Sequence, residues 1–293
     1  MNERRISLRR QITALLLALV LAACLPCRAN TEVWTFYRSD IPLYLAVVKH
    51  LETHLKRRFV SCPIERTSSS FIDSHSPQMV IALGEAGLQR ALTMTWNVPI
   101  LAVFVDRPSN DSRVVDIDIP QPHLRQLELL KKLHPGLKTI WYPFAGDGFA
   151  PSPALEKGVE RAGLKLVVNR LQDPRGLPEA LRVLDNPTVA TILPPDPGLM
   201  NDAITRPVML AAFRSQTAIV GFSEAIVKKG AAFAFVLSPE RIAAYLDSVV
   251  DGFDDRSSVP DFDQWDLILN ATILDKLQLS PSAEIRTTAV KVF

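Results

Sequence analysis

Glu85 is the residue whose position says most about chemistry, because it follows a glycine at the start of a predicted helix. Gly84 ends the apolar run Met79–Leu83, and a helix that begins there presents free backbone N–H groups that can bind a carboxylate or phosphate. A glutamate beside those groups competes for them and repels an anion, which indicates a ligand with a neutral or positively charged group. The alternative is that Glu85 only complements the helix dipole and points to solvent.

The other candidate ligand-binding residues also come directly after predicted strands. Ligands of parallel sheets bind outside the carboxyl ends of the strands, so these loops are the place to search. The candidates are Ser39, Asp40, Ser68, Ser69, Gly84, Glu85, Ala86, Asp106, Phe144, Asp196, Phe222, Ser223 and Glu224. Ser39, Asp40 and Ser223 also suit helix N-caps. Phe144 and Phe222 either sandwich an aromatic or apolar ligand or belong to the core.

The predicted strand ends carry more acidic than basic side chains. The acidic residues are Asp40, Glu85, Asp106, Asp147, Asp196 and Glu224, and the basic residues close to them in sequence are Arg38 and Arg107. Carboxylates that share a water-poor cleft raise one another's pKa unless cations or hydrogen-bond donors balance them. The pattern therefore predicts a neutral, zwitterionic or cationic ligand rather than a phosphate or dicarboxylate.

No arrangement of residues in the sequence indicates catalysis or a metal site. Residues 221–225 approach the G-x-S-x-G elbow of hydrolases, but Ala225 stands where the second glycine is needed. His50 and His54 have a spacing that can bind a metal, yet no third ligand accompanies them. The phosphate-binding pattern G-x-x-x-x-G-K-[ST] does not occur. We therefore expect no enzyme, no catalytic residues, no metal and no cofactor, and any ATP hydrolysis belongs to a partner.

The N-terminal segment predicts an export signal. Four arginines precede a short apolar run, residues 14–20, and small residues lie directly before Cys24. The run is too short to span a bilayer, and the small residues suit cleavage just before the cysteine. The segment resembles bacterial lipoprotein signals, which implies a signal peptide over residues 1–23, a lipid on Cys24 and a tether over residues 24–30. Cleavage after Ala29 is the alternative, and it would produce a soluble periplasmic protein.

Charge and cysteine content narrow the class of protein. The chain of 293 residues has a formal net charge of +2, and removal of residues 1–23 changes it to −1 because four arginines and one glutamate are lost. The chain is near-neutral, and its basic cluster is limited to residues 56–58, so it lacks the clustered positive charge that is typical of nucleic-acid-binding proteins. Cys27 and Cys62 remain for a disulfide, which an oxidising periplasm permits.

Predicted strands and helices alternate along the mature chain. Strands are predicted over 33–37, 79–83, 98–105, 138–144, 164–169, 189–193, 217–222, 231–237 and 265–270, and helices over 41–55, 84–95, 121–134, 155–162, 178–184, 203–215, 224–229, 239–250 and 271–277. This alternation predicts an α/β fold with parallel sheets. The pattern restarts after the polar loop 106–111, so we expect one lobe over 31–112 plus 238–262 and a second over 113–237 plus 263–293.

Four groups of segments carry a family resemblance. They are residues 126–140, residues 79–84 with 98–100, residues 228–231, and residues 267–271 with 277–281. Their helix, turn and strand motifs resemble ABC-transporter substrate-binding proteins, in particular the tryptophan- and tyrosine-binding-like family. The resemblance implies the type I periplasmic-binding-protein fold, in which two Rossmann-like lobes joined by hinge strands close on a small solute. Residues 112–118 depart from the family pattern, because a Gly/Asn/Thr-rich stretch is usual there.

The resemblance also implies a function without chemistry of its own. We expect an extracytoplasmic solute-binding protein of an ABC-type transport system, lipid-anchored in the periplasm and monomeric. Its partners would be a small-molecule ligand and an ABC permease or membrane sensor, and not nucleic acid. The alternative is an orphan sensory or regulatory lipoprotein of the cell envelope that acts through protein–protein contacts.

Overall fold

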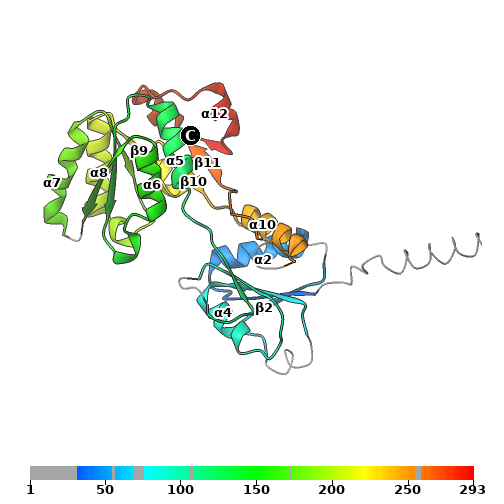
Figure 1. Cartoon of the computed structure of the whole chain (residues 1–293). Helices are drawn as coiled ribbons and strands as arrows, with labels where there is room; N and C mark the ends of the chain where they lie inside the picture. Colours follow the sequence, from blue (N-terminus) through cyan, green and yellow to red (C-terminus); the bar gives the residue numbers. More distant parts are fainter. Residues whose placement is uncertain (1–31, 55–56, 69–75, 106–108, 172, 255–258) are drawn as a thin grey trace, which may run out of the picture. The chain divides into compact units, whose positions relative to one another are not determined.

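The computed structural model describes residues 32–54, 57–68, 76–105, 109–171, 173–254 and 259–293. These residues form two compact units (Figure 1). The smaller unit contains the described residues up to Asp118 and those within Val250–Val259, and the larger unit contains those within Ile119–Val249 and Pro260–Phe293. The lobe boundaries expected from the sequence stay a prediction. Within the described ranges, no helix is long and apolar enough to cross a membrane.

The smaller unit is built on a five-stranded parallel sheet with the order β2-β1-β3-β4-β5. Its elements are β1 (Val33–Tyr37), α2 (Pro42–His54), β2 (Phe59–Pro63), β3 (Met79–Leu83), α4 (Gly84–Leu92), β4 (Ile100–Val103) and β5 (Val114–Ile117). The strands β1, β3 and β4 are buried along their whole length, as expected for central strands of a covered parallel sheet. Leu88 and Ala91 of α4 pack on one face, against Trp34 and Phe36 of β1.

Both edge strands of this sheet differ from the sequence prediction. No strand is predicted for Phe59–Pro63 or for residues 112–118, whereas the structure forms β2 over Phe59–Pro63 and β5 within residues 112–118. The guanidinium of Arg113 holds the start of β5, because it donates to the carbonyl oxygens of Met94 and Trp96, both at 2.8 Å. These contacts join residues far apart in sequence, so local periodicity does not reveal them.

The larger unit is built on a seven-stranded sheet with the order β12-β11-β10-β9-β8-β6-β7. Its strands are β6 (Thr139–Phe144), β7 (Lys165–Arg170), β8 (Val189–Ile192), β9 (Ala218–Gly221), β10 (Phe233–Val236), β11 (Asp266–Leu269) and β12 (Lys291–Val292). The helices that begin in this unit are α5 (His123–Leu133), α6 (Pro153–Arg161), α7 (Leu177–Leu181), α8 (Asp202–Arg214), α9 (Glu224–Lys229), α10 (Pro239–Gly252), α11 (Ala271–Lys276) and α12 (Ala283–Thr288). All strand pairs are parallel except β10 and β11, which pair antiparallel.

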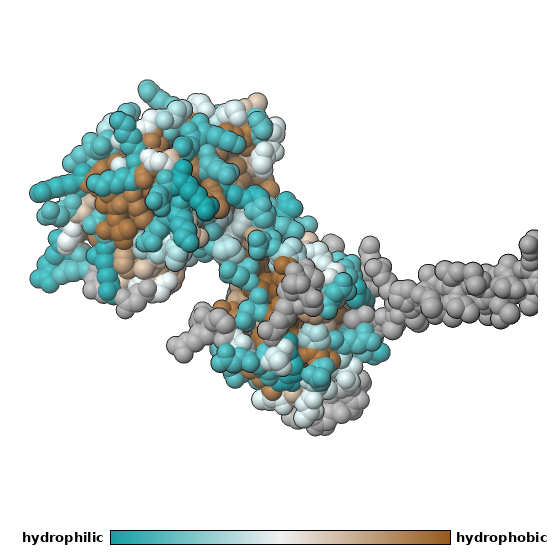
Figure 2. Space-filling view, in the orientation of Figure 1, coloured by the Kyte–Doolittle hydropathy of each residue, from teal (hydrophilic) through white to brown (hydrophobic). Residues whose placement is uncertain are grey.

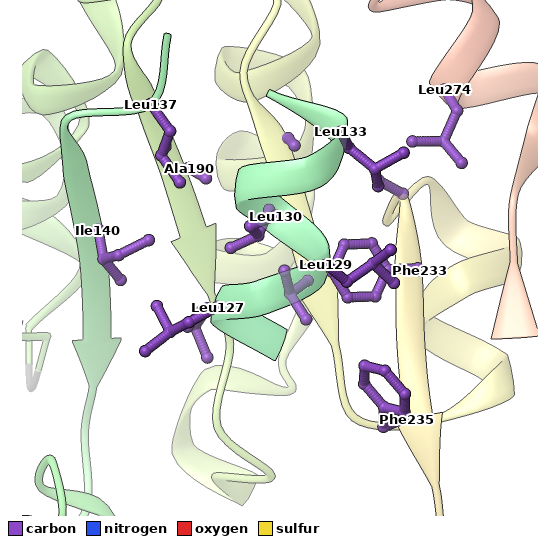
Figure 3. Close-up of a cluster of buried hydrophobic side chains, with 14 of the residues drawn as sticks. Leu127, Leu129, Leu130, Leu133, Leu137, Ile140, Ala190, Phe233, Phe235 and Leu274 are labelled. Carbon is purple, nitrogen blue, oxygen red and sulfur yellow. The ribbon is translucent and has the colours of Figure 1, made fainter. Parts of the chain in front are cut away.

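Alternate residues of the central strands enter two separate cores. Ile140 and Tyr142 of β6 belong to the core under α5 and α6, whereas Trp141 belongs to the core under α7 and α8. Figure 3 shows the leucines of α5 lying over the strands, near Phe233 and Phe235 of β10. A period of two, with apolar residues on both faces, is the pattern of a sheet covered by helices on both sides. The predicted α/β fold with two mainly parallel sheets is confirmed.

Candidate functional site

A depression of about 430 Å³ lies where β9 and β10 end in the larger unit. We call it the strand-end pocket. Its lining residues are Gln121, Pro195, Phe222, Ser223, Glu224, Phe235, Val236, Leu237, Trp265 and Ile268. The structure therefore brings together Phe222, Ser223 and Glu224, which the sequence analysis proposes as ligand-binding residues. Ligands of α/β sheets bind at the carboxyl ends of the strands, so this pocket is the leading candidate site.

Trp265 reaches this pocket because β11 runs antiparallel to β10. Val236 at the end of β10 pairs with Asp266 at the start of β11, so the residue before β11 lies at the carboxyl end of β10. Phe222, Phe235 and Trp265 thereby line one pocket, where aromatic side chains offer a large contact area. Trp265 is not among the residues predicted from the sequence, because alternating strands and helices predict parallel strands, and a parallel β11 would begin at the opposite edge.

Ser223 and Glu224 also have structural partners. The hydroxyl of Ser223 accepts a hydrogen bond from the backbone N–H of Ile226 at 3.4 Å, as the N-cap of α9. The carboxylate of Glu224 lies 2.7 Å from the ammonium group of Lys228 and 2.6 Å from that of Lys291. Hydrogen bonds from these two lysines lower the pKa of Glu224, which keeps it ionised. The pocket thus contains a carboxylate whose charge is already balanced.

Asp196 is buried, and its carboxylate holds two strand-end loops together. One oxygen accepts hydrogen bonds from the backbone N–H groups of Ala145 at 2.5 Å and Gly146 at 2.9 Å, and the other accepts one from Gly198 at 2.8 Å. These bonds join the loop after β6 to the loop after β8. Burial, together with the negative charge of Asp196, raises the pKa of Tyr142 to about 12. The contacts of Asp196 therefore indicate a structural role, and its ligand role stays a prediction.

Phe144 and its neighbours on the α5 side belong to the core. Phe144 is half-buried at the end of β6 and packs against the cluster that contains Tyr142. His123 is buried nearby, with its ring edge-on to Tyr142 at 6.2 Å between centroids. Its Nδ1 lies 3.0 Å from the side-chain oxygen of Gln126. Burial lowers the pKa of His123, so the imidazole is neutral at physiological pH.

In the smaller unit, Ser39 and Asp40 follow β1 and are held by neighbours. The guanidinium of Arg38 donates to the carboxylate of Asp40 at 2.9 Å through Nε, and this hydrogen bonding lowers the pKa of Asp40. The hydroxyl of Ser39 donates to the carboxylate of Glu65 at 3.4 Å. Both candidates therefore take part in polar contacts at the protein surface.

Glu85 is exposed in the first turn of α4 and accepts a hydrogen bond from the side chain of Gln89 at 3.0 Å. This contact along the helix favours the alternative in which Glu85 complements the helix dipole, and its ligand role stays a prediction. Gly84 has φ +75°, and a Cβ there would lie 2.6 Å from the hydroxyl oxygen of Tyr44. Glycine is therefore required both by the backbone and by the close approach of Tyr44. Ala86 is half-buried beside them in the chain.

An aromatic pair that the sequence analysis missed lies beside Gly84. The rings of Tyr44 in α2 and Phe104 after β4 are stacked, with centroids 5.7 Å apart and planes at 11°. Phe104 has φ +58°, a left-handed conformation that costs a bulky residue about 1–3 kcal/mol and that concentrates at functional sites. The apolar pattern predicts a strand over 98–105 that includes Phe104, because the apolar run continues past the end of β4 at Val103.

Several predicted residues lie outside the described ranges. They include Cys24, Cys27, Ser69, Asp106 and Arg107. Ser68 is exposed and directly precedes one of the gaps. The lipid on Cys24 and the ligand roles of Ser69 and Asp106 therefore stay predictions.

Three of the strand-end carboxylates, those of Asp40, Asp196 and Glu224, are balanced within their own unit. Arg38 neutralises Asp40, two lysines neutralise Glu224, and three backbone N–H groups solvate Asp196. The pKa values of Asp40 and Glu224 are lowered, not raised. Cations and hydrogen-bond donors thus offset the repulsion among these three carboxylates, which was one reason to predict a ligand without negative charge. The residues that line the strand-end pocket therefore indicate the class of ligand better than these carboxylates do.

Within the part of the chain that the structure describes, no group of three or more His, Cys, Asp or Glu residues could hold a metal ion. Cys62 is a free thiol in the core beside α4, and burial raises its pKa to about 12. A disulfide with Cys27 stays a prediction.

Comparison with known proteins identifies the fold. No protein-family model and no curated protein matches this chain. A substrate-binding protein with adhesive properties from Clostridium difficile, in its ligand-free, open form, aligns over 90% of this chain and 100% of its own, with a TM-score of 0.65 and 18% identity. This chain has the type I periplasmic-binding-protein fold. The fold expected from the family resemblance is therefore confirmed.

Two further structures with this fold align over similar lengths. An ABC domain in complex with L-Trp from Streptococcus pneumonia covers 89% of this chain and 100% of its own, with a TM-score of 0.52 and 17% identity. A conserved domain protein from Vibrio cholerae covers 90% and 100%, with a TM-score of 0.52 and 16% identity. A fold hosts many functions, so the residues of the site must carry the functional conclusion.

Proposed function

We propose that this protein is an extracytoplasmic solute-binding protein of an ABC-type transport system, and that its ligand is a small neutral, zwitterionic or cationic molecule. The observation that carries the proposal is the strand-end pocket, a depression lined by three aromatic side chains at the ligand-binding edge of a type I fold. Pockets for small molecules are mostly apolar with a few polar groups that orient the ligand, and this lining matches that description.

The lining also supports the ligand class. Phe222, Phe235 and Trp265 can contact a planar or apolar group, while Gln121 and Glu224 supply polar side chains. Among the described residues that line the pocket, none is Lys or Arg. An anionic ligand would therefore find no direct cation in the lining. Because Lys228 and Lys291 already balance the carboxylate of Glu224, the lining favours the neutral and zwitterionic members of this ligand class.

The similar structures agree with this chemistry. The Streptococcus protein was solved with L-Trp, a zwitterion with an aromatic ring, and the Clostridium protein is described as a substrate-binding protein. The predicted lipoprotein signal supports a position outside the cytoplasm, tethered to a membrane through Cys24. A binding protein in this position would deliver its ligand to an ABC permease.

The ligand can be found by a thermal-shift screen of neutral, zwitterionic and cationic metabolites, followed by calorimetry on Phe222→Ala and Trp265→Ala. Burial of an aromatic side chain contributes about 1.5–3 kcal/mol, so we expect affinity to fall about 10- to 100-fold in each variant. Val168→Ala is the control, because Val168 is an exposed apolar residue of the same unit outside the pocket.

Two outcomes would contradict the proposal. Tight binding of an anion that depends on Phe222 would refute the proposed ligand class. A ligand that binds both aromatic variants with the affinity of the wild type would refute the proposed site. Uptake of the ligand by cells that lack the gene tests the transport role. Unchanged uptake would favour the sensory or regulatory alternative.

A further inference from the structure

The larger unit has a second depression, of about 420 Å³, along one face of α8. We call it the α8 groove and define it by Arg206, Met209, Leu210, Phe213, Lys229 and Ile273. It shares no lining residue with the strand-end pocket. Figure 2 shows that the visible face of this unit is a mosaic of apolar patches among hydrophilic residues.

The α8 residues of the groove follow helical spacing, with the polar ones near the start of the helix and the apolar ones near its end. Leu210 and Phe213 are 47% and 48% exposed, which is unusual for adjacent large apolar side chains on one helical face. Gly230, which adjoins Lys229, has φ +126°, and a Cβ there would lie 4.0 Å from the sulfur of Met209. Met209 and Ile273 are half-buried in the same lining, so the apolar half of the groove is accessible.

Cations surround this apolar surface. Arg206 and Lys229 line the groove, and the ammonium group of Lys276 lies 5.7 Å from the centre of the Phe213 ring. The one carboxylate among the lining residues belongs to Asp202, 3.9 Å from Lys229. Two cations against one carboxylate leave the described lining of the groove with a net positive charge, which attracts an anion.

We infer that the α8 groove binds a small amphiphilic organic anion. The apolar part of the anion lies against Met209, Leu210 and Phe213, and its anionic group lies near Arg206 and Lys229. The volume falls in the range of about 300–1,000 Å³ that is typical of small-molecule sites. This ligand differs in charge from the solute proposed for the strand-end pocket, so the two sites can be tested separately.

Calorimetry with decanoate as the probe tests the inference on the mature protein. We expect saturable binding of one decanoate per chain, and a decrease in affinity of about tenfold or more in Arg206→Glu and in Phe213→Ser. Arg214→Glu is the matched control, because Arg214 belongs to the same helix but does not line the groove, and its affinity should stay within about twofold of wild type. Decylammonium, which has the same chain with the opposite charge, should bind at least about tenfold more weakly.

Several results would overturn the inference. Absence of saturable decanoate binding would do so, as would equal binding of decylammonium. Loss of decanoate binding in Phe222→Ala, with Arg206→Glu unaffected, would place the probe in the strand-end pocket instead. A dimer that disappears in Phe213→Ser without decanoate binding would assign the groove to a second copy of the chain. Circular dichroism of each variant establishes that the exposed substitutions leave the fold intact.

Discussion

Substitution of Asp196 by Asn tests whether this residue supports the fold or contacts a ligand. The change keeps the shape of the side chain and removes its charge. Asp196 is 1% exposed, and its two oxygens accept hydrogen bonds from the backbone N–H groups of Ala145, Gly146 and Gly198. An asparagine offers one oxygen and one NH₂ group, so at least one of the three N–H groups would face another donor.

The magnitude follows from these three bonds. Hydrogen bonds to a charged group contribute about 1.5–3 kcal/mol, and a buried donor left without an acceptor costs about 1–3 kcal/mol. If the asparagine oxygen still accepts hydrogen bonds from Ala145 and Gly146, the N–H group of Gly198 loses its acceptor. The other two hydrogen bonds become weaker because their acceptor is no longer charged. We therefore expect the larger unit to lose about 2–4 kcal/mol of unfolding free energy.

Urea unfolding followed by circular dichroism measures this loss, and hydrogen exchange of peptides from residues 139–200 shows whether it occurs in the larger unit. Asp185→Asn is the matched control, because Asp185 is exposed in the same unit, and its change should stay within about 0.5 kcal/mol. If Asp196→Asn were as stable as wild type but bound the solute poorly, the structural role assigned here would be refuted and Asp196 would be a ligand contact.

Three other predictions concern packing, pH and export. Gly87→Ala should destabilise the smaller unit by about 1–3 kcal/mol in urea unfolding, because a Cβ would lie 2.5 Å from the backbone oxygen of Phe36; Gly252→Ala, with nothing within 4 Å, should be neutral. Burial lowers the pKa of His123 in the folded protein below its ordinary value of 6.5. The unfolding free energy should therefore be at its full value above about pH 6.5, and it should decrease as the pH falls through the lower pKa of the folded state, because the unfolded chain binds the proton more readily. The same pH slope in His123→Gln would show that another group causes it. Cys24→Ala should release the protein from the membrane fraction, and unchanged detergent partitioning would contradict lipid attachment.

The sequence by itself determined the secondary structure of the central elements and the class of fold. The run Met79–Leu83 is apolar at every position, as a strand covered on both faces must be, and the structure has this strand as β3. Ser223 before Glu224–Lys229 and Gly230 after it are the start and end signals of a helix, and α9 has these bounds. These features depend on residues close together in the chain, which is why periodicity and capping reveal them.

Tertiary structure alone decided which strand-end residues share a site and which serve the fold. The antiparallel direction of β11 moves Trp265 into the strand-end pocket, and no local pattern distinguishes the two directions. Glu224 and Asp196 also have partners in distant segments, since Lys291 is 67 residues from Glu224 and Ala145 is 51 residues from Asp196. The charge state and exposure of a carboxylate depend on such partners, so the same residue type became a backbone clamp at Asp196 and a pocket residue at Glu224.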